Sequence, residues 1–323
     1  MRDRLGRTID YMRVSITDRC NLRCRYCMPQ GVRLVEHEDV LRYEEILRIC
    51  RSAVALGVTK FKITGGEPLA RKGCAGFLAQ LKALDGVESV TLTTNGVLLP
   101  GQLPALAEAG LDGANISLDT LDDALYSRLT GSVPGTAQAV LDAVGDCAGA
   151  GIRTKINAVL LPETLDGAAD LAAVAQDLPV DVRFIEMMPI GRGAGEHTVP
   201  LDAALERLRL EWPDLHVTEE KRGSGPAVYY ASAALTGRIG IIGAVSRPFC
   251  AGCNRVRLTS TGQLKPCLCF GGGTDLRRLL RSGATDEALE AAMAQCIRHK
   301  PAAHRFGQAG AVTELRAMSQ IGG

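Results

Sequence analysis

Apolar residues in the first two-thirds of the chain alternate between the spacing of strands and the spacing of helices. This repeat predicts a parallel sheet whose strands are joined by helices. Strands are predicted at residues 11–17, 60–64, 89–94, 114–118, 154–160 and 181–186. Helices are predicted at residues 42–56, 74–84, 103–109, 135–150 and 165–178. Six such units are too few for a full eight-stranded barrel, so the pattern alone allows an incomplete barrel or an open doubly wound sheet.

The pattern changes towards the C-terminus. Residues 189–200 are rich in glycine and proline and predict a loop. Short strands are predicted at residues 227–231, 238–242 and 255–259, and helices at residues 275–281 and 285–299. A tail at residues 319–323 ends in two glycines. We therefore expect one region over residues 1–225 and a smaller C-terminal α+β region over residues 226–323.

Composition narrows the functional classes. The 323 residues are 46% hydrophobic, which is enough for a full core, and the formal net charge is only +1. With 4% aromatic residues as well, the chain is a poor candidate for a nucleic-acid-binding module. It contains no apolar signal-peptide core and no run of about 18 apolar residues, so we expect a cytoplasmic protein without membrane contact. An anionic ligand would have to meet a local cluster of basic side chains.

Eleven cysteines are many for a cytoplasmic protein, where clustered cysteines more often bind metals than form disulfides. The first cluster, Cys20-Asn-Leu-Arg-Cys24-Arg-Tyr26-Cys27, follows directly on the first predicted strand. Three thiolates can each hold one iron of a four-iron cluster and leave the fourth iron open. A zinc knuckle with His37 as a distant fourth ligand is the alternative.

This cysteine spacing resembles the radical S-adenosylmethionine superfamily. The Gly65-Gly66-Glu67-Pro68 turn after the second predicted strand strengthens the resemblance. In that superfamily the open iron binds the methionine part of S-adenosylmethionine, and one electron then releases a 5′-deoxyadenosyl radical. The resemblance implies cofactor contacts from Tyr26, Gly66, Ser117 and Met188.

A second three-thiolate set is formed by Cys250, Cys253 and Cys267. Its spacing also suits a zinc ribbon with Cys269 as fourth ligand, so spacing alone leaves both options open. Arg255 and Arg257 alternate along the strand predicted beside these cysteines. Their forked guanidinium groups suit phosphate oxygens and bring positive charge close to the metal site.

Together the two cysteine sets and the Gly-Gly end resemble the GTP 3′,8-cyclase family of molybdenum cofactor (molybdopterin) biosynthesis over essentially the whole chain. The resemblance implies a lyase with two 4Fe-4S clusters and S-adenosyl-L-methionine, which converts GTP to 3′,8-cyclo-7,8-dihydro-GTP. The implied fold is an incomplete (β/α)6 TIM-like barrel. A radical peptide-modifying enzyme and a zinc-ribbon binding module are the alternatives.

The family match assigns roles to individual residues. The metal ligands that the resemblance implies are Cys20, Cys24, Cys27, Cys250, Cys253 and Cys267. The GTP contacts that the resemblance implies are Arg13, Lys62, Thr93, Lys155, Arg255, Val256 and Arg257. Arg183, on the sixth predicted strand, is expected to assist them. The family usually has arginine at the position of Lys62, and lysine keeps the charge without the forked geometry.

The two last residues, Gly322 and Gly323, match a family tail that reaches into the active site, where they act with Arg255 and Arg257 as catalytic residues. A tail without side chains can enter a narrow cavity. The resemblance also implies an external one-electron donor and a following pathway enzyme that receives the product. It allows a homodimer.

Overall fold

The computed structural model describes residues 1–308 and 310–322. Six parallel strands form its centre: β1 (Tyr11–Ser15), β2 (Lys60–Thr64), β3 (Ser89–Thr94), β4 (Gly113–Ser117), β5 (Arg153–Leu160) and β6 (Asp181–Glu186). Each strand pairs with the next one in sequence. A doubly wound sheet reverses its strand order at a switch point, and this sheet does not. The incomplete (β/α)6 barrel is therefore confirmed and the doubly wound alternative is excluded.

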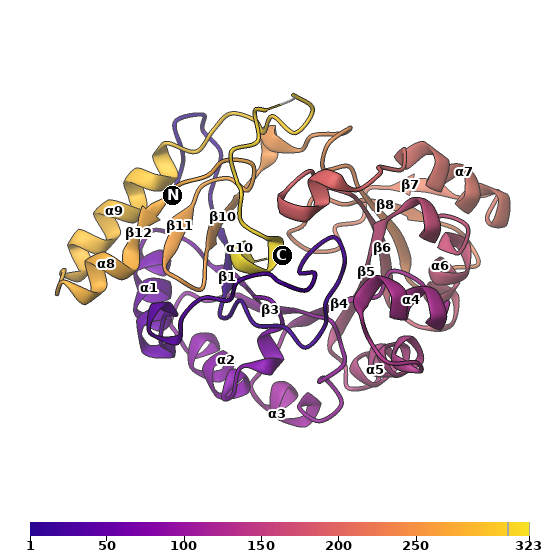
Figure 1. Ribbon diagram of the computed structural model, residues 1–323, viewed down its shortest axis with the longest axis horizontal. Coiled ribbons are helices and arrows are strands. Elements are labelled where there is room, and N and C mark those ends of the chain that lie inside the picture. The colour runs from indigo at the N-terminus through magenta and orange to yellow at the C-terminus, as the bar shows by residue number, and fades with distance from the viewer. Residues whose placement is uncertain (309, 323) are drawn as a thin grey trace.

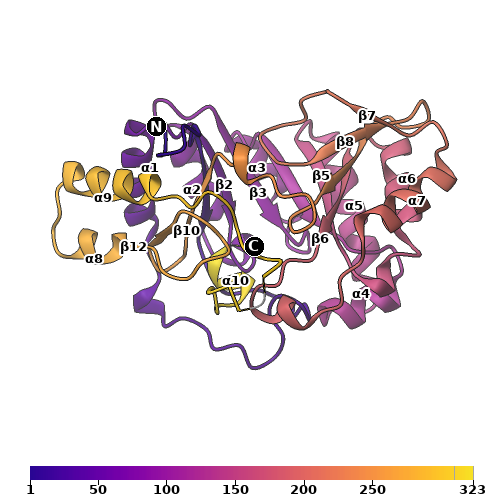
Figure 2. The ribbon, with the colours of Figure 1, turned by 90° about the horizontal axis from the view of Figure 1, so that it is seen from above.

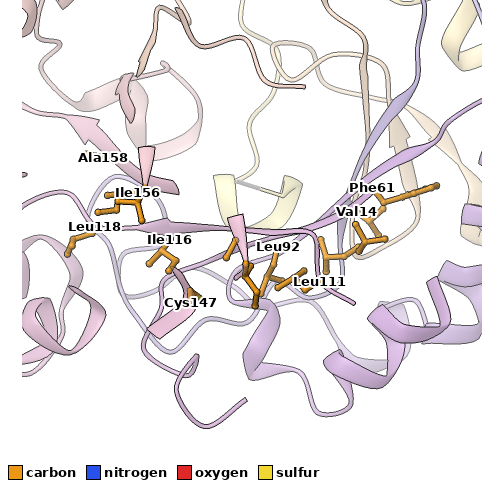
Figure 3. Packing of buried hydrophobic residues seen from close by; sticks show 14 of the residues in the cluster. Val14, Phe61, Leu92, Leu111, Ile116, Leu118, Cys147, Ile156 and Ala158 are labelled. Carbon is orange, nitrogen blue, oxygen red and sulfur yellow. The ribbon is translucent and has the colours of Figure 1, made fainter. Parts of the chain in front are cut away.

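Helices follow one another around the outer face of the curved sheet (Figure 1). They are α1 (Tyr43–Ala55), α2 (Cys74–Lys82), α3 (Leu103–Glu108), α4 (Asp123–Thr130), α5 (Thr136–Gly149) and α6 (Ala168–Asp177). The main hydrophobic core lies between these helices and the sheet, as the labelled residues in Figure 3 illustrate. The alternation of residues along β3 explains why the core lies on this face of the sheet, because Val90 and Leu92 point into it and are buried. Ser89 and Thr91 face the interior of the barrel instead.

The C-terminal third extends the sheet at both edges. At one edge β9 (Arg238–Ile242) pairs parallel with β6, followed by β8 (Val228–Ala231) and β7 (His216–Thr218). At the other edge β10 (Arg255–Leu258) pairs parallel with β1, followed by β11 (Gln263–Lys265) and β12 (Thr274–Asp275). Strands on both sides of residue 225 thus share one sheet, and the predicted division at that residue stays a prediction.

The remaining helices are α7 (Leu201–Glu211), α8 (Leu276–Arg281), α9 (Asp286–Arg298) and α10 (Met318–Ile321). The sequence analysis missed α4, α7 and the short α10. The side chain of Asp122 caps α4 by accepting a hydrogen bond from the Leu125 amide, and Gly131 ends it in the left-handed region. The predicted 189–200 loop contains a short 3₁₀ helix at Gly191–Gly195. Among the described residues, no helix has the length and apolar character that crossing a membrane requires.

Candidate active site

A cavity of about 390 Å³ lies in the concave interior of the barrel. Ten basic side chains line it, and no Asp or Glu of the described chain does. The basic residues are Arg13, Lys60, Lys62, Arg153, Lys155, Arg183, Arg222, Arg255, Arg257 and Lys300. Such a concentration of positive charge without carboxylates strongly favours a polyanionic ligand.

The first cysteine set occupies the loop that follows β1. The carbonyl of Cys24 accepts hydrogen bonds from the amides of Cys27 (3.1 Å) and Met28 (2.9 Å), which closes a tight turn. Burial raises the pKa of Cys24 well above its ordinary value and that of Cys27 to about 12. The isolated thiols are therefore protonated at neutral pH, and binding of iron must release these protons.

The Gly-Gly-Glu-Pro turn packs its backbone directly against this cysteine loop. A Cβ at Gly65 would lie 2.5 Å from the carbonyl oxygen of Thr17, and one at Gly66 would lie 2.4 Å from that of Arg19. Glycine is therefore required at both positions. The carboxylate of Glu67 accepts hydrogen bonds from the amides of Leu69 and Asn95 and the hydroxyl of Thr94. The hydrogen bonds from Thr94 and Asn95 join the turn to the end of β3.

A contact that sequence reasoning missed fixes Tyr26. Its hydroxyl donates a 2.6 Å hydrogen bond to the carboxylate of Asp119, which is buried just after β4. The other oxygen of Asp119 accepts from the amide of Val159. Burial raises the pKa of Asp119, although both hydrogen bonds oppose this shift. The cysteine loop is thus tied to the ends of β4 and β5.

Three further predicted residues differ in whether they line the cavity: the cofactor contacts Met188 and Ser117 and the GTP contact Thr93. Met188 lines the cavity, whereas Ser117, at the end of β4, does not. Thr93 lies on the same face of β3 as the lining residue Thr91, but is not itself part of the cavity wall. Its buried hydroxyl has no hydrogen-bond partner in the described chain, so it remains available to a ligand.

All three cysteines of the second set, Cys250, Cys253 and Cys267, line the cavity. Burial raises the pKa of Cys253, but the charges of Lys300 and Arg255 outweigh this effect and lower it. Cys269 is fully buried outside the cavity wall, and its sulfur accepts a hydrogen bond from the Arg305 amide. It is close enough to Cys267 and Cys250 to interact with them electrostatically, but it does not line the cavity.

The spacing of the cysteine side chains bears on the kind of metal site that they can form. Within residues 1–308 and 310–322, no three His, Cys, Asp or Glu side chains converge tightly enough to hold one metal ion. A zinc ribbon needs four ligands around one zinc at about 2.3 Å. A four-iron cluster instead assigns each thiolate its own iron and tolerates a wider spacing. At the first cysteine set, the three thiols on one loop therefore suit a four-iron cluster.

Two basic residues that the sequence analysis did not select hold the second set together. Lys300 donates hydrogen bonds to the carbonyls of Arg255 (2.8 Å) and Pro266 (2.6 Å). Arg7 donates to the carbonyl of Cys250 (2.9 Å) and to those of three residues at 300–302. Neither contact has a local sequence signal, because the partners are far apart along the chain.

Most predicted substrate residues converge on the cavity. Arg13, Lys62 and Lys155 line it, as do Arg183, Arg255 and Arg257. The ammonium group of Lys62 makes no hydrogen bond or ion pair with the described residues, and burial lowers its pKa well below the ordinary value.

Val256 differs from these residues. Its side chain is fully buried in the hydrophobic core on the opposite face of β10. The predicted contact of Val256 with substrate can therefore involve only its backbone, and the alternation of β10 explains why its two arginine neighbours face the cavity.

The C-terminal tail enters the barrel. Figures 1 and 2 both show α10 inside the curve of the sheet. The backbone of Ser319 hydrogen-bonds the thiol of Cys27, and the carbonyl of Gly322 accepts a 2.6 Å hydrogen bond from Arg257. The tail therefore spans from the first cysteine set to the cavity wall. The predicted catalytic residue Gly323 lies outside the described residues.

Comparisons with known proteins agree with this architecture. Residues 14–175 match the Radical SAM superfamily, and residues 180–306 match the family Molybdenum Cofactor Synthesis C. Among solved structures, Streptococcus suis SuiB bound to S-adenosylmethionine superimposes with a TM-score of 0.65 at 16% identity, over 89% of this chain and 68% of that one. A partial barrel with a cysteine triad directly after its first strand thus defines a radical S-adenosylmethionine enzyme.

Two curated relatives narrow the class further. A GTP 3′,8-cyclase of Heliobacterium modesticaldum is 42% identical over 330 residues, covering 100% of both chains. A GTP 3′,8-cyclase of Geobacter sulfurreducens is 42% identical over 326 residues, covering 99% of both chains. The chain belongs to the GTP 3′,8-cyclase family, whose members are lyases.

Family membership implies one 4Fe-4S cluster and S-adenosylmethionine. The first cysteine set fits this pair of cofactors, because its three thiols are free and lie on one loop. Gly65 and Gly66 hold the turn against that loop, and the amides of Gly66 and Glu67 donate hydrogen bonds to the carbonyls of Thr17 and Arg19.

Proposed function

We propose that this protein converts GTP to 3′,8-cyclo-7,8-dihydro-GTP, the first committed product of molybdenum cofactor biosynthesis. The observation that carries the proposal is the cavity lined by ten basic side chains and, within the described chain, by no carboxylate. A nucleoside triphosphate bears several negative charges and needs such surroundings. The three cysteines at the cavity wall add a metal site that can meet the base.

We also propose that Cys250, Cys253 and Cys267 hold a second 4Fe-4S cluster. All three line the cavity, while Cys269 is hydrogen-bonded outside it. A set of three protein ligands leaves one iron open. This arrangement supports a guanine contact at the cavity wall, with Arg255 and Arg257 on the same face of β10.

The protein's own residues bind and orient the substrate. Arg13, Lys62 and Lys155 supply charge for the phosphates. When bound, the first cluster and S-adenosylmethionine supply the radical that removes a hydrogen atom from the ribose. Ring closure joins C3′ of the ribose to C8 of guanine, and an electron and a proton complete the product. The buried barrel interior excludes water, which would otherwise quench reactive species.

An anoxic activity assay tests the proposal. The purified protein is loaded with iron and sulfide and incubated with dithionite, S-adenosylmethionine and GTP. We expect 5′-deoxyadenosine together with the cyclised nucleotide. The Cys24→Ser variant should form neither. A fully loaded protein that cleaves S-adenosylmethionine without converting GTP would falsify the assignment of substrate.

The reaction also requires an external one-electron donor, and the product passes to the next enzyme of the pathway. We place the reaction in the cytoplasm, because a reducing compartment keeps thiols free. All eleven cysteines are free of disulfides in the structure.

A further inference from the structure

A loop between β7 and β8 contributes a separate group of residues to the cavity wall. Arg222, Gly223, Ser224, Gly225 and Pro226 line the cavity in one continuous stretch, which we call the 222–226 loop. Residues 223–225 are exposed to solvent, unlike the buried cations deeper in the barrel. Gly223 has a φ of +115°, a conformation that favours glycine. The loop therefore forms an exposed rim of the cavity.

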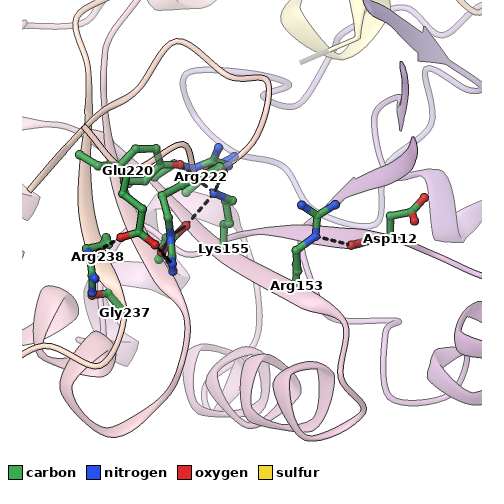
Figure 4. Close-up of polar contacts among 11 residues, drawn as sticks. Asp112, Arg153, Lys155, Glu220, Arg222, Gly237 and Arg238 are labelled. Atoms are coloured by element: carbon green, nitrogen blue, oxygen red, sulfur yellow. Dashed lines mark hydrogen bonds and ion pairs between the residues drawn. The ribbon is translucent and has the colours of Figure 1, made fainter. Parts of the chain in front are cut away.

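The loop is connected to the barrel through one buried carboxylate. Asp181, at the start of β6, accepts from Arg222 at 2.7 Å through one oxygen and from Lys155 at 2.6 Å through the other. Lys155 also donates to the backbone carbonyl of Arg222 and, at 2.8 Å, to the hydroxyl of Tyr229. Figure 4 shows Lys155 and Arg222 directed towards one another. Arg222 also pairs with Glu220 at 2.8 Å, and Glu220 is shared with Arg238. These three cations and two carboxylates together keep a net positive charge.

The amides of the loop add further donors. Gly223, Ser224 and Gly225 make no hydrogen bonds within the described chain, through either backbone or side chain. The position of a Cβ at Gly225 would be 3.8 Å from the guanidinium of Arg183, a cation of the cavity wall. Backbone amides beside clustered guanidinium groups form an anion-binding surface.

We propose that Arg222, with the 222–226 loop, binds the terminal phosphate of the nucleoside triphosphate and so determines selectivity for a triphosphate over a diphosphate. This inference rests on the proposed function. The ribose reacts by radical chemistry and has to stay away from water. The phosphate chain is therefore the part of the substrate that extends to the exposed rim, and its end meets the loop.

Asp181 has a positioning role in this arrangement. It holds Arg222 and Lys155 at the cavity wall before substrate arrives, so little side-chain freedom is lost on binding. Nε and Nη2 of Arg222 face Asp181, and Nη1 faces the exposed Glu220. The second N–H of each terminal nitrogen is left for phosphate.

The test uses the anoxic enzyme with its clusters and compares the dissociation constants of GTP and GDP by equilibrium dialysis. The main variant is Arg222→Gln, which removes the charge but keeps a donor for Asp181. We expect the preference for GTP over GDP to fall by about tenfold or more, because a charge-assisted contact is lost. Arg222→Lys should retain most of the preference, which separates loss of charge from loss of structure.

Arg238→Gln is the matched control. Arg238 pairs with Glu220, as Arg222 does, but it does not line the cavity. This variant should keep the wild-type preference. An Arg222→Gln enzyme that binds GTP and GDP in the wild-type ratio overturns the inference, even if both affinities fall. A wild-type enzyme that binds neither nucleotide overturns the proposed function itself and this inference with it.

Discussion

The guanidinium of Arg257 donates a 2.6 Å hydrogen bond to the backbone carbonyl of Gly322. This contact joins a strand beside the second cysteine set to the end of the chain, inside the barrel. Gly322 has a φ of +80°, and a Cβ there would lie 3.1 Å from Thr64 and 3.2 Å from Ser15. The tail thus fits a site that accepts glycine and little else.

Replacing Gly322 with alanine should therefore lower GTP turnover at least about tenfold, since the added methyl group meets both a conformational penalty and tight packing. The measurement is the rate of cyclised product at saturating GTP. Gly307→Ala is the control, because Gly307 has open space around its Cβ position and no positive φ. Equal rates for the two variants would contradict a role for the tail.

The segment that leads into the tail, which contains Glu314, is also held by a buried ion pair. Lys265 is fully buried, and its ammonium group contacts the carboxylate of Glu314 and the carbonyl of Phe270. Glu314→Gln leaves Lys265 without a counter-charge, and we expect a loss of about 3–5 kcal/mol in unfolding free energy. Hydrogen exchange of residues 313–321 should become faster. The exposed Glu219→Gln variant is the control, and unchanged exchange in Glu314→Gln would show that the pair does not anchor the tail.

Iron analysis tests which cysteines bind the second cluster. The enzyme with two clusters should contain about eight irons per chain, and Cys253→Ser should contain about four. Cys269→Ser should keep about eight, because the sulfur of Cys269 is hydrogen-bonded outside the cavity. Loss of iron in Cys269→Ser would make this thiol a ligand and close the second cluster.

Glu67 should make stability depend on pH. Burial raises its pKa to about 7, so between about pH 4.5 and 7 the native chain binds a proton that the unfolded chain has released. The contribution is therefore most favourable at low pH and is lost as pH rises through the folded pKa. From pH 5.5 to 8 we expect the wild-type unfolding free energy to fall by about 2 kcal/mol relative to Glu67→Gln. Urea unfolding at both pH values measures this, and parallel pH profiles would contradict it.

The hydroxyl of Tyr26 should matter for the cysteine loop. Tyr26→Phe removes a donor from the buried carboxylate of Asp119 and should cost about 1–3 kcal/mol. It should also slow cleavage of S-adenosylmethionine, because the loop is no longer tied to β4. Tyr230→Phe is the matched control, since Tyr230 is buried but its hydroxyl makes no hydrogen bond within the described chain. If both variants behave alike, the contact with Asp119 has no positioning role.

Periodicity located the six central strands closely, because each has a buried apolar face. A glycine just after the following helix marks several of the units, as Gly57 does after α1. The two cysteine sets were visible from spacing alone. Arg7 was not, because its contact with Cys250 joins residues 243 positions apart. Asp119 and Arg222 were missed for the same reason: each acts through partners that only the folded sheet brings near. α7 was missed although Leu201, Ala204, Leu205 and Leu208 have helical spacing.

The parallel pairing of β1 with β10 means that the first strand to be synthesised obtains one of its neighbours only after residue 255 has been added. Until then a nascent chain carries an unsatisfied edge at β1, of the kind that invites association with other strands. A chain truncated before residue 255 therefore exposes β1 as an unpaired edge, open to pairing with strands of other molecules.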